Sequence, residues 1–359
     1  MKGPEGTPAV PEARSILREH MPVVGVVLVY CLAGYAVEAA AGLPRRMENV
    51  WFETTYQVYP ILALLALPFA FAAHRWRIRD ERGEWIPGLA GWRAALGGDG
   101  TGFFTAPRLA GVVVTAVLMP LFLNTYGSWK GMIPHLHPFA LDTAFTDLDR
   151  LIHLGRLPWE LLQPLLGHPV VTRTIDVLYI LWLPLNAGVL VWQGWSRRDD
   201  RARFFLSYLL VYVVLGTAAA IALSAAGPCY YAAVTGRASP YAPLMAYLTA
   251  LDADQPIIAL RVQRTLWENY ATSRNIPFVG ISAMPSVHVA VAVLFALVGW
   301  RTSRLLGWLF TAYACVILIG SVHLGWHYAV DGYFSIAGAL LIWAGVRLLL
   351  RRFGRVALP

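Results

Sequence analysis

Long apolar segments separated by short charged ones constrain this chain more than any other feature. A helix crosses a bilayer with roughly 17 to 25 consecutive apolar residues. On that criterion the sequence predicts eight spans, the sixth of them short, at residues 22–43, 56–73, 109–126, 170–192, 204–226, 286–300, 305–322 and 330–350. Only 14% of the residues are charged and 57% are hydrophobic, whereas about a quarter are charged in soluble domains. We therefore expect an all-α, polytopic membrane helix bundle.

The segments between the spans predict the topology. Arginine-rich segments fall on one side of the membrane, at residues 1–21, 75–93, 197–203, 301–304 and 347–355. The segments on the other side are longer and mixed in charge, at residues around 45, 130–169, 227–284 and 321–329. Because basic residues favour the cytoplasmic side, both termini are expected there. The same short arginine runs account for the net charge of +8, so no nucleic-acid partner is expected.

The chain is expected to divide into an N-terminal region, residues 1–106 with two spans, and a six-span core, residues 107–359. The first apolar segment, 22–43, has small residues near its end and could be read as a cleaved signal peptide. We favour a retained span, because the segment is longer than a signal core and its loss would disturb the charge alternation. The three cysteines, Cys31, Cys229 and Cys315, are odd in number and predict no disulfide framework.

The core carries two long outer loops, 128–169 and 227–284. Residues 142–166 place apolar side chains at helical spacing among charged ones, which predicts a helix at the membrane interface. The loop at 227–284 is long enough for two or more short helices. Long loops of this kind commonly cap or shape a binding site.

Three polar stretches fall on the non-cytoplasmic side. In the last of them His323, His327 and Asp331 are four residues apart, so they would share one helical face if the chain is helical from residue 322. Asp331 could accept the Nδ1 proton of His327 and leave Nε2 free to attack or to take a proton. Two other interpretations stay open: a structural hydrogen bond at the entrance of a span, and a metal site formed by the three side chains. The metal site is less favoured, because the other stretches suit phosphate.

The second stretch, Pro285-Ser-Val-His288, begins a span. Proline suits the first helical turn, and the free N–H groups of Ser286, Val287 and His288 would form a cradle for an anion. Ser286 could add a hydroxyl donor, and His288 could protonate a leaving oxygen. The alternative is an ordinary proline-initiated span with an incidental histidine.

The third stretch, residues 130–138, contains one of the two lysines of the chain, Lys130, and the other is Lys2. A lysine in a chain that otherwise uses arginine indicates a compact charge for a phosphate oxygen. A simply solvated loop lysine is the alternative.

Together these stretches resemble the type 2 phosphatidic acid phosphatase superfamily, whose signature is Lys-x6-Arg-Pro, Pro-Ser-Gly-His and Ser-Arg-x5-His-x3-Asp. Lys130 and Pro138 match the first motif with His137 at the arginine position. Pro285, Ser286 and His288 match the second with Val287 at the glycine position. The third is matched by His327 and Asp331, with Gly320 and Ser321 at the Ser-Arg positions. The two missing arginines argue against simple phosphomonoester hydrolysis.

The run His327-Tyr-x-x-Asp331, with His323 before it, resembles the branch that contains inositol phosphorylceramide synthases of the aureobasidin-resistance type and sphingomyelin synthases. This resemblance implies catalysis by His327, Asp331 and His288 through a phosphohistidine on His327. It implies phosphoryl-oxygen contacts from Lys130, His137, Ser286, Val287 and His323, with no metal and no cofactor.

Three functions follow. The first is transfer of a phospho-head-group, such as inositol phosphate, from a phospholipid donor to a lipid acceptor such as ceramide. The second is a lipid or polyprenyl phosphate phosphatase with water as acceptor. The third is a transporter or non-catalytic membrane protein, for which only Glu38, Arg173 and Asp176 supply mid-span polar groups. The alanine- and arginine-rich composition favours a high-GC bacterium, with the protein in the inner membrane and the site on its periplasmic face.

Overall fold

The computed structural model describes residues 9–43, 46–48, 86–96, 105–273 and 279–352, with isolated positions 68, 71, 72, 75, 84 and 276. Within these residues every regular element is a helix. Six helical segments are long and apolar enough to cross a membrane: Glu19–Ala40, Arg108–Leu136, Pro169–Gly194, Arg198–Ala222, Arg304–His323 and Ala329–Arg352. The expected all-α polytopic bundle is therefore confirmed.

These six segments correspond to six of the eight predicted spans. They are built from α1 (Ala9–Ala40), α4 (Ala106–Leu136), α7 (Pro169–Ile180) with α8 (Trp182–Gly194), α9 (Arg198–Leu210) with the π-helix η2 (Val211–Ala219) and α10 (Ala220–Ala222), α15 (Arg304–His323) and α16 (Ala329–Arg352). The predicted short span at 286–300 is α14 (Val287–Thr302), an apolar helix of 16 residues. The predicted span at 56–73 lies almost entirely outside the described residues. A short helix, α3 (Gly88–Leu96), precedes α4.

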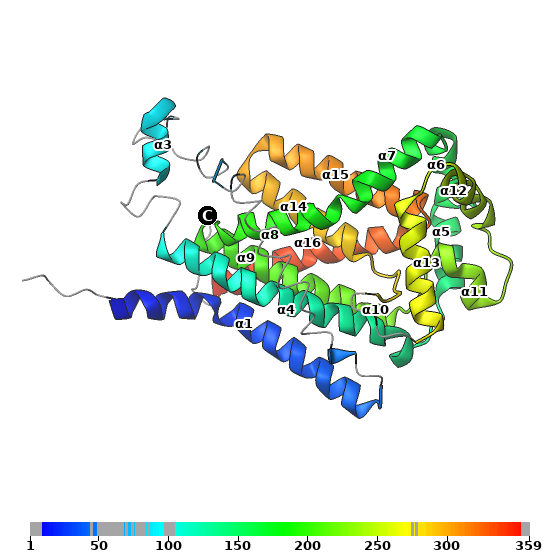
Figure 1. The fold of residues 1–359 in the computed structure, drawn as a ribbon, viewed down its shortest axis with the longest axis horizontal. Helices are drawn as coiled ribbons and strands as arrows, with labels where there is room; N and C mark the ends of the chain where they lie inside the picture. Colours follow the sequence, from blue (N-terminus) through cyan, green and yellow to red (C-terminus); the bar gives the residue numbers. More distant parts are fainter. Residues whose placement is uncertain are drawn as a thin grey trace, which may run out of the picture.

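Helix α14 lies inside the bundle, and it packs most extensively against α15 and α16 (Figure 1). Its buried face includes Ala290 and Ala292, whose small side chains allow close helix packing. A Cβ at Gly299 would lie 2.6 Å from the backbone oxygen of Leu306, so glycine is required where α14 meets α15. The two helices thus form a tight hairpin at the end of α14 and the start of α15.

The short helices between residues 142 and 271 gather at one end of the bundle, and α16 ends toward the other (Figure 1). They are α5 (Asp142–Ile152), α6 (Pro158–Leu166), the 3₁₀ turn η3 (Pro228–Tyr230), α11 (Tyr231–Thr235), α12 (Ala242–Asp254) and α13 (Ile258–Ala271). The prediction of two or more helices in 227–284 is confirmed. The single interfacial helix predicted over 142–166 is wrong: Leu154 and Gly155 adopt positive φ angles of 57° and 87°, which separate α5 from α6.

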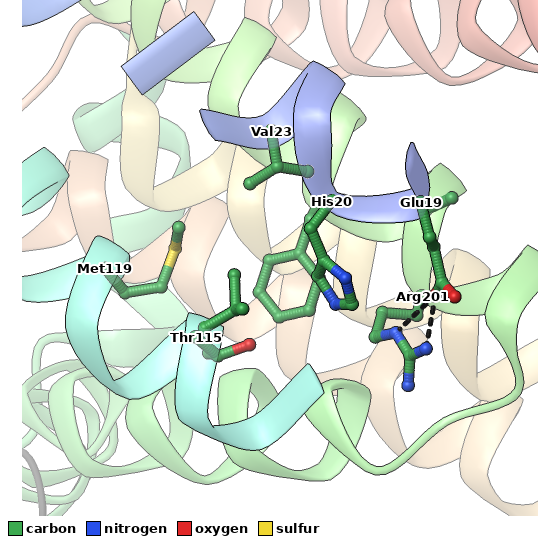
Figure 2. Close-up of a pocket in the computed structure, with 9 residues that line it drawn as sticks. Glu19, His20, Val23, Thr115, Met119 and Arg201 are labelled. Carbon is green, nitrogen blue, oxygen red and sulfur yellow. Dashed lines mark hydrogen bonds and ion pairs between the residues drawn. The ribbon is translucent and has the colours of Figure 1, made fainter. Parts of the chain in front are cut away.

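At the opposite end a buried ion pair joins α1 to the corner between α8 and α9 (Figure 2). Glu19 accepts hydrogen bonds from Arg201, and their side chains are only 7% and 4% exposed. Arg201 also donates to the carbonyl oxygens of Gly194 and Ser196, each at 3.2 Å. A buried guanidinium needs acceptors for its N–H groups and a counter-charge, because a buried charge without partners is costly. Glu19, His20 and Arg201 line a small cavity of about 20 Å³, which is enough for about one water.

Candidate active site

A cavity of about 420 Å³ opens near the end of the bundle where the short helices gather. Its wall is formed by α4, α7, α8, η2, α13, the start of α14 and the turn before α16. Lys130, His288 and His327, one from each polar stretch of the sequence, all line it, together with Val287. The structure therefore brings residues that are up to 197 positions apart to one cavity.

The two histidines and the aspartate of the last stretch do not lie on one continuous helix, so the condition for one shared helical face is not met. Helix α15 ends at His323, a turn with Gly325 at a φ of 73° follows, and α16 begins at Ala329. Asp331, in the first turn of α16, is 3.2 Å from His327 Nδ1 and also accepts the backbone N–H of Tyr328 at 3.1 Å. With Nδ1 donating to the carboxylate, Nε2 is the nitrogen of His327 that is left to accept a proton or attack.

His288 is the second residue of α14, and its ring is held between two aromatic side chains. The ring centroids of Tyr179 and Trp182 lie 5.3 Å and 4.4 Å from the His288 ring centroid. The indole N–H of Trp182 donates to the backbone oxygen of His288 at 3.2 Å. These contacts determine the direction of the imidazole, which faces the cavity.

Ser286 is the N-cap of α14, so Pro285 precedes the helix and does not occupy its first turn as expected. The Ser286 hydroxyl accepts the N–H of Val289 at 3.5 Å and is fully buried, outside the cavity lining. The first N–H groups of a helix have no partner within it, and the helix dipole makes this end positive. The N–H groups of Val287 and His288 therefore remain suited to an anion.

Lys130 lies near the C-terminal end of α4. It has no ion-pair partner among the described residues, and it is the only lysine or arginine among those that line the cavity. The backbone at Gly280 packs directly against the backbone of Lys130. A Cβ at Gly280 would lie 2.7 Å from the carbonyl carbon of Lys130. No side chain at position 280 can therefore cover the lysine.

Besides Ser286, two further predicted phosphate ligands lie outside the cavity lining. His137 Nδ1 is 2.7 Å from the backbone oxygen of Ile221, and His323 Nε2 is 2.9 Å from the Thr172 hydroxyl. Neither histidine lines the cavity. Each connects one helix to another behind the wall. The described residues also contain no group of three His, Cys, Asp or Glu side chains arranged to hold a metal ion.

Two carboxylates of α5 support the site, and the sequence prediction missed this role. Asp149 accepts the N–H groups of Ala329 and Val330, the first residues of α16, at 2.9 Å and 3.0 Å. Burial raises the pKa of Asp149 to about 6, although these two hydrogen bonds act to lower it. Its position on the buried face of an amphipathic helix was the available signal.

Asp142, two helical turns earlier on α5, holds the preceding turn. It accepts the N–H of Gly227 at 2.8 Å and the hydroxyl of Tyr328 at 2.7 Å. Tyr328 is the residue directly after His327. Helix α5 therefore holds both the histidine turn and the start of the following helix.

These features define a polytopic helical membrane protein with two histidines, one of them oriented by a carboxylate, at a single cavity. The chain belongs to the PAP2 superfamily, whose family model matches residues 143–348. His288, His327 and Asp331 lie within the matched part, and Lys130 precedes it. Comparison with curated proteins and with solved structures gave no match. Membership assigns the chain to a superfamily of phosphatase-type membrane enzymes.

Proposed function

We propose that the protein is a lipid phosphotransferase that moves a phospho-head-group, such as inositol phosphate, from a phospholipid to a lipid hydroxyl such as that of ceramide. The observation that carries the proposal is the meeting of Lys130, His288 and His327 at one cavity, with His327 Nδ1 3.2 Å from Asp331. A nucleophile, its orienting carboxylate, an acid–base group and a cation are the parts that this transfer requires.

In the first half-reaction Nε2 of His327 attacks the phosphorus. The bond from phosphorus to the lipid oxygen breaks, and protonated His288 gives its proton to that oxygen, releasing diacylglycerol. The phosphoryl group remains on His327. In the second half-reaction neutral His288 takes the proton of the acceptor hydroxyl, whose oxygen attacks the phosphorus and frees His327. Asp331 stabilises the charge on His327 in both halves.

The phosphoryl oxygens would be held by Lys130 and by the N–H groups at the start of α14, including that of Val287. Ser286 would position these N–H groups as the helix cap. His137 and His323 would support the surrounding helices and not contact the phosphate. These donors are fixed before the reaction, so they stabilise the developing charge without reorganisation.

Two observations favour a phosphodiester donor over a phosphomonoester. Lys130 is the only lysine or arginine among the described lining residues, and a diester carries one negative charge where a monoester carries up to two. Ser321, at the position of a phosphatase arginine, is fully buried and donates to the carbonyl of Leu318 at 2.7 Å. Hydrolysis by the same histidines, with water as acceptor, is the second candidate.

The cavity wall supports a lipid substrate. Leu183, Ile258 and Val262 line the cavity, yet they are 56%, 37% and 37% exposed on the molecular surface. Because these apolar side chains line the cavity and are also exposed on the outside of the bundle, they mark an opening between α8 and α13. A lipid could enter there from the bilayer with its acyl chains still in hydrocarbon.

A transport function has less support. Asp176 accepts the N–H groups of Ile258 and Ala259 at 2.7 Å and 2.9 Å and caps α13. Arg173 pairs with Asp254 at 2.8 Å, and Glu38 accepts the N–H of Met47 at 2.6 Å. Each of these mid-span candidates therefore has a local structural partner and forms no relay with the others.

The test uses purified protein in vesicles that contain head-group-labelled phosphatidylinositol and ceramide. We expect labelled head-group on ceramide, together with acid-labile labelled protein when the acceptor is omitted. Both should be lost in His327→Ala and retained in the matched variant His168→Ala, whose histidine lies outside the cavity lining. Free inositol phosphate or phosphate as the only product would support hydrolysis, and no labelled product would refute both reactions.

The proposed location is a bacterial inner membrane with the site on the periplasmic face. Arg203 lies near the start of α9, Arg301 near the end of α14 and Arg347 near the end of α16. These helix ends lie at the opposite end of the bundle (Figure 1). By the positive-inside rule that end would be cytoplasmic.

A further inference from the structure

The cavity continues below the phosphate-binding level into the membrane-spanning part of the bundle. Tyr126 lines it one turn before Lys130 on α4. Asn186 lines it one turn beyond Trp182 on α8, and Trp182 is bonded to His288. Since one helical turn rises about 5.4 Å, Tyr126 lies about one turn deeper than Lys130, and Asn186 lies about one turn deeper than Trp182. Tyr212 of η2 completes the cluster.

This cluster contains hydrogen-bond donors that have no acceptor among the described residues. The Asn186 amide donates to the Tyr208 hydroxyl at 3.0 Å. The single proton of Tyr208 is directed to Asn186 Oδ1 at 3.2 Å or to the Tyr212 hydroxyl at 3.1 Å. Among the described residues no acceptor takes the second amide proton of Asn186 or the hydroxyl proton of Tyr126, and the hydroxyl proton of Tyr212 is also unused when Tyr208 donates to Tyr212. Asn186 and Tyr212 are only 6% and 2% exposed.

Unused donors at this depth point to a ligand. Within the hydrocarbon region there is no bulk water to accept a hydrogen bond, and an unsatisfied polar group is costly. Asparagine and tyrosine are uncharged at neutral pH, so the complementary group is a neutral acceptor such as a carbonyl oxygen. The remaining wall at this depth is apolar and includes Leu123, Ile180 and Leu183.

We propose that Tyr126, Asn186 and Tyr212 form a subsite for the acyl carbonyl of the lipid substrate. This inference rests on the proposed function for the position of the phosphate. In a glycerolipid or sphingolipid the first ester or amide carbonyl lies a few bonds from the phosphorus, a distance comparable with one helical turn. A polyprenyl phosphate has only hydrocarbon there. The subsite therefore selects acyl lipids over polyprenyl lipids.

The test compares diacyl donors with their dialkyl ether analogues, which lack only the carbonyl oxygens. Phosphatidylinositol and phosphatidic acid are each supplied in both forms, with undecaprenyl phosphate as a further donor, and release of the lipid alcohol is measured. Each hydrogen bond should favour the diacyl form about three- to tenfold in kcat/KM. In Tyr212→Phe and Tyr126→Phe this ratio should fall toward one, because the diacyl rate decreases and the dialkyl rate does not.

The matched control is Tyr30→Phe, which removes a buried hydroxyl bonded to Thr217 at 2.6 Å, outside the cavity lining. Its diacyl-to-dialkyl ratio should equal that of the wild type. The two Phe variants each remove one oxygen atom, so they also remain informative where Asn186→Leu fails to fold. An equal rate on diacyl and dialkyl donors in the wild type, or an equal loss on both in the variants, would overturn the subsite while leaving the phosphotransfer proposal intact. Absence of lipid alcohol from every donor would overturn both.

Discussion

Asp149 supplies a test of how the site is held. Its carboxylate accepts two buried N–H groups at the start of α16, and Asp149→Ala leaves both without an acceptor. Since each unsatisfied buried donor costs about 1 to 3 kcal/mol, the unfolding free energy should fall by roughly 2 to 6 kcal/mol. The same helix start carries Asp331, which orients His327. We therefore expect kcat to fall about tenfold or more, with a smaller change in KM because Asp149 does not line the cavity.

The pKa of Asp149 adds a pH dependence of known sign. Burial raises this pKa from 3.8 to about 6, so between those values the folded protein binds a proton that the unfolded chain has released. Stability should therefore decrease as pH rises through this window, by about 3 kcal/mol in total, at about 1.4 kcal/mol per pKa unit. Asp149→Asn removes the titrating group. The stability of the wild type relative to this variant should decrease across the window and stay constant above it.

Thermal unfolding of the detergent-solubilised proteins across this pH range measures the difference, and turnover on the phospholipid donor measures the effect on kcat. Asp252→Asn is the matched control, because Asp252 on α12 also accepts a backbone N–H, that of Ile257 at 2.7 Å, but at the start of α13 and not of α16. Its pKa is lowered by that hydrogen bond, so its own contribution is lost only below its ordinary pKa. Parallel pH profiles for wild type and Asp149→Asn, or full turnover in Asp149→Ala, would refute the reasoning.

Three further predictions concern other parts of the molecule. Asp331→Asn should lower the rate of phosphohistidine formation by about 10⁴-fold, because His327 loses its orienting carboxylate; an unchanged single-turnover rate would contradict this. Lys130→Ala should lower kcat/KM about 10²-fold, and Lys130→Arg should restore part of it; a larger defect in the arginine variant than in the alanine variant would argue against a charge role. Glu19→Gln leaves Arg201 buried without its counter-charge and should cost about 3 to 5 kcal/mol, seen as a lower melting temperature with unchanged turnover by the folded fraction; an unchanged melting temperature would show that the ion pair is not stabilising.

The spans could be predicted from sequence because each needs only a sufficient run of apolar residues, whatever it packs against. The predicted spans 305–322 and 330–350 placed His327 between two helices, where the structure has it. The condition for one shared helical face was not met, because a spacing of four residues also fits a turn followed by a new helix. Gly325 was the local signal for that turn, since its φ of 73° is one that glycine adopts readily.

Which side chains face the cavity depends on tertiary contacts, and these cannot be predicted from the local sequence. Both His137 and His323 stand beside motif residues, yet each ring is turned to a neighbouring helix. Conversely, Asp149 belongs to none of the motifs and yet contacts the first residues of α16. Proximity along the chain therefore predicted which segments meet at the cavity, but not which side chains face it.

The length of α14 sets the depth at which a lipid would have to react. Its 16 residues span about 24 Å, some 6 Å less than the hydrocarbon core of a typical bilayer. Arg301, near the C-terminal end of α14, and Arg304, just after it, place that end at the polar boundary of the bilayer. The N-terminal end of α14, with His288, therefore lies about 6 Å short of the opposite boundary. A phosphate that reaches this histidine must leave the head-group plane and sink toward the acyl region. Local thinning of the bilayer around α14 would shorten that descent, so turnover should respond to the chain length of the surrounding lipids.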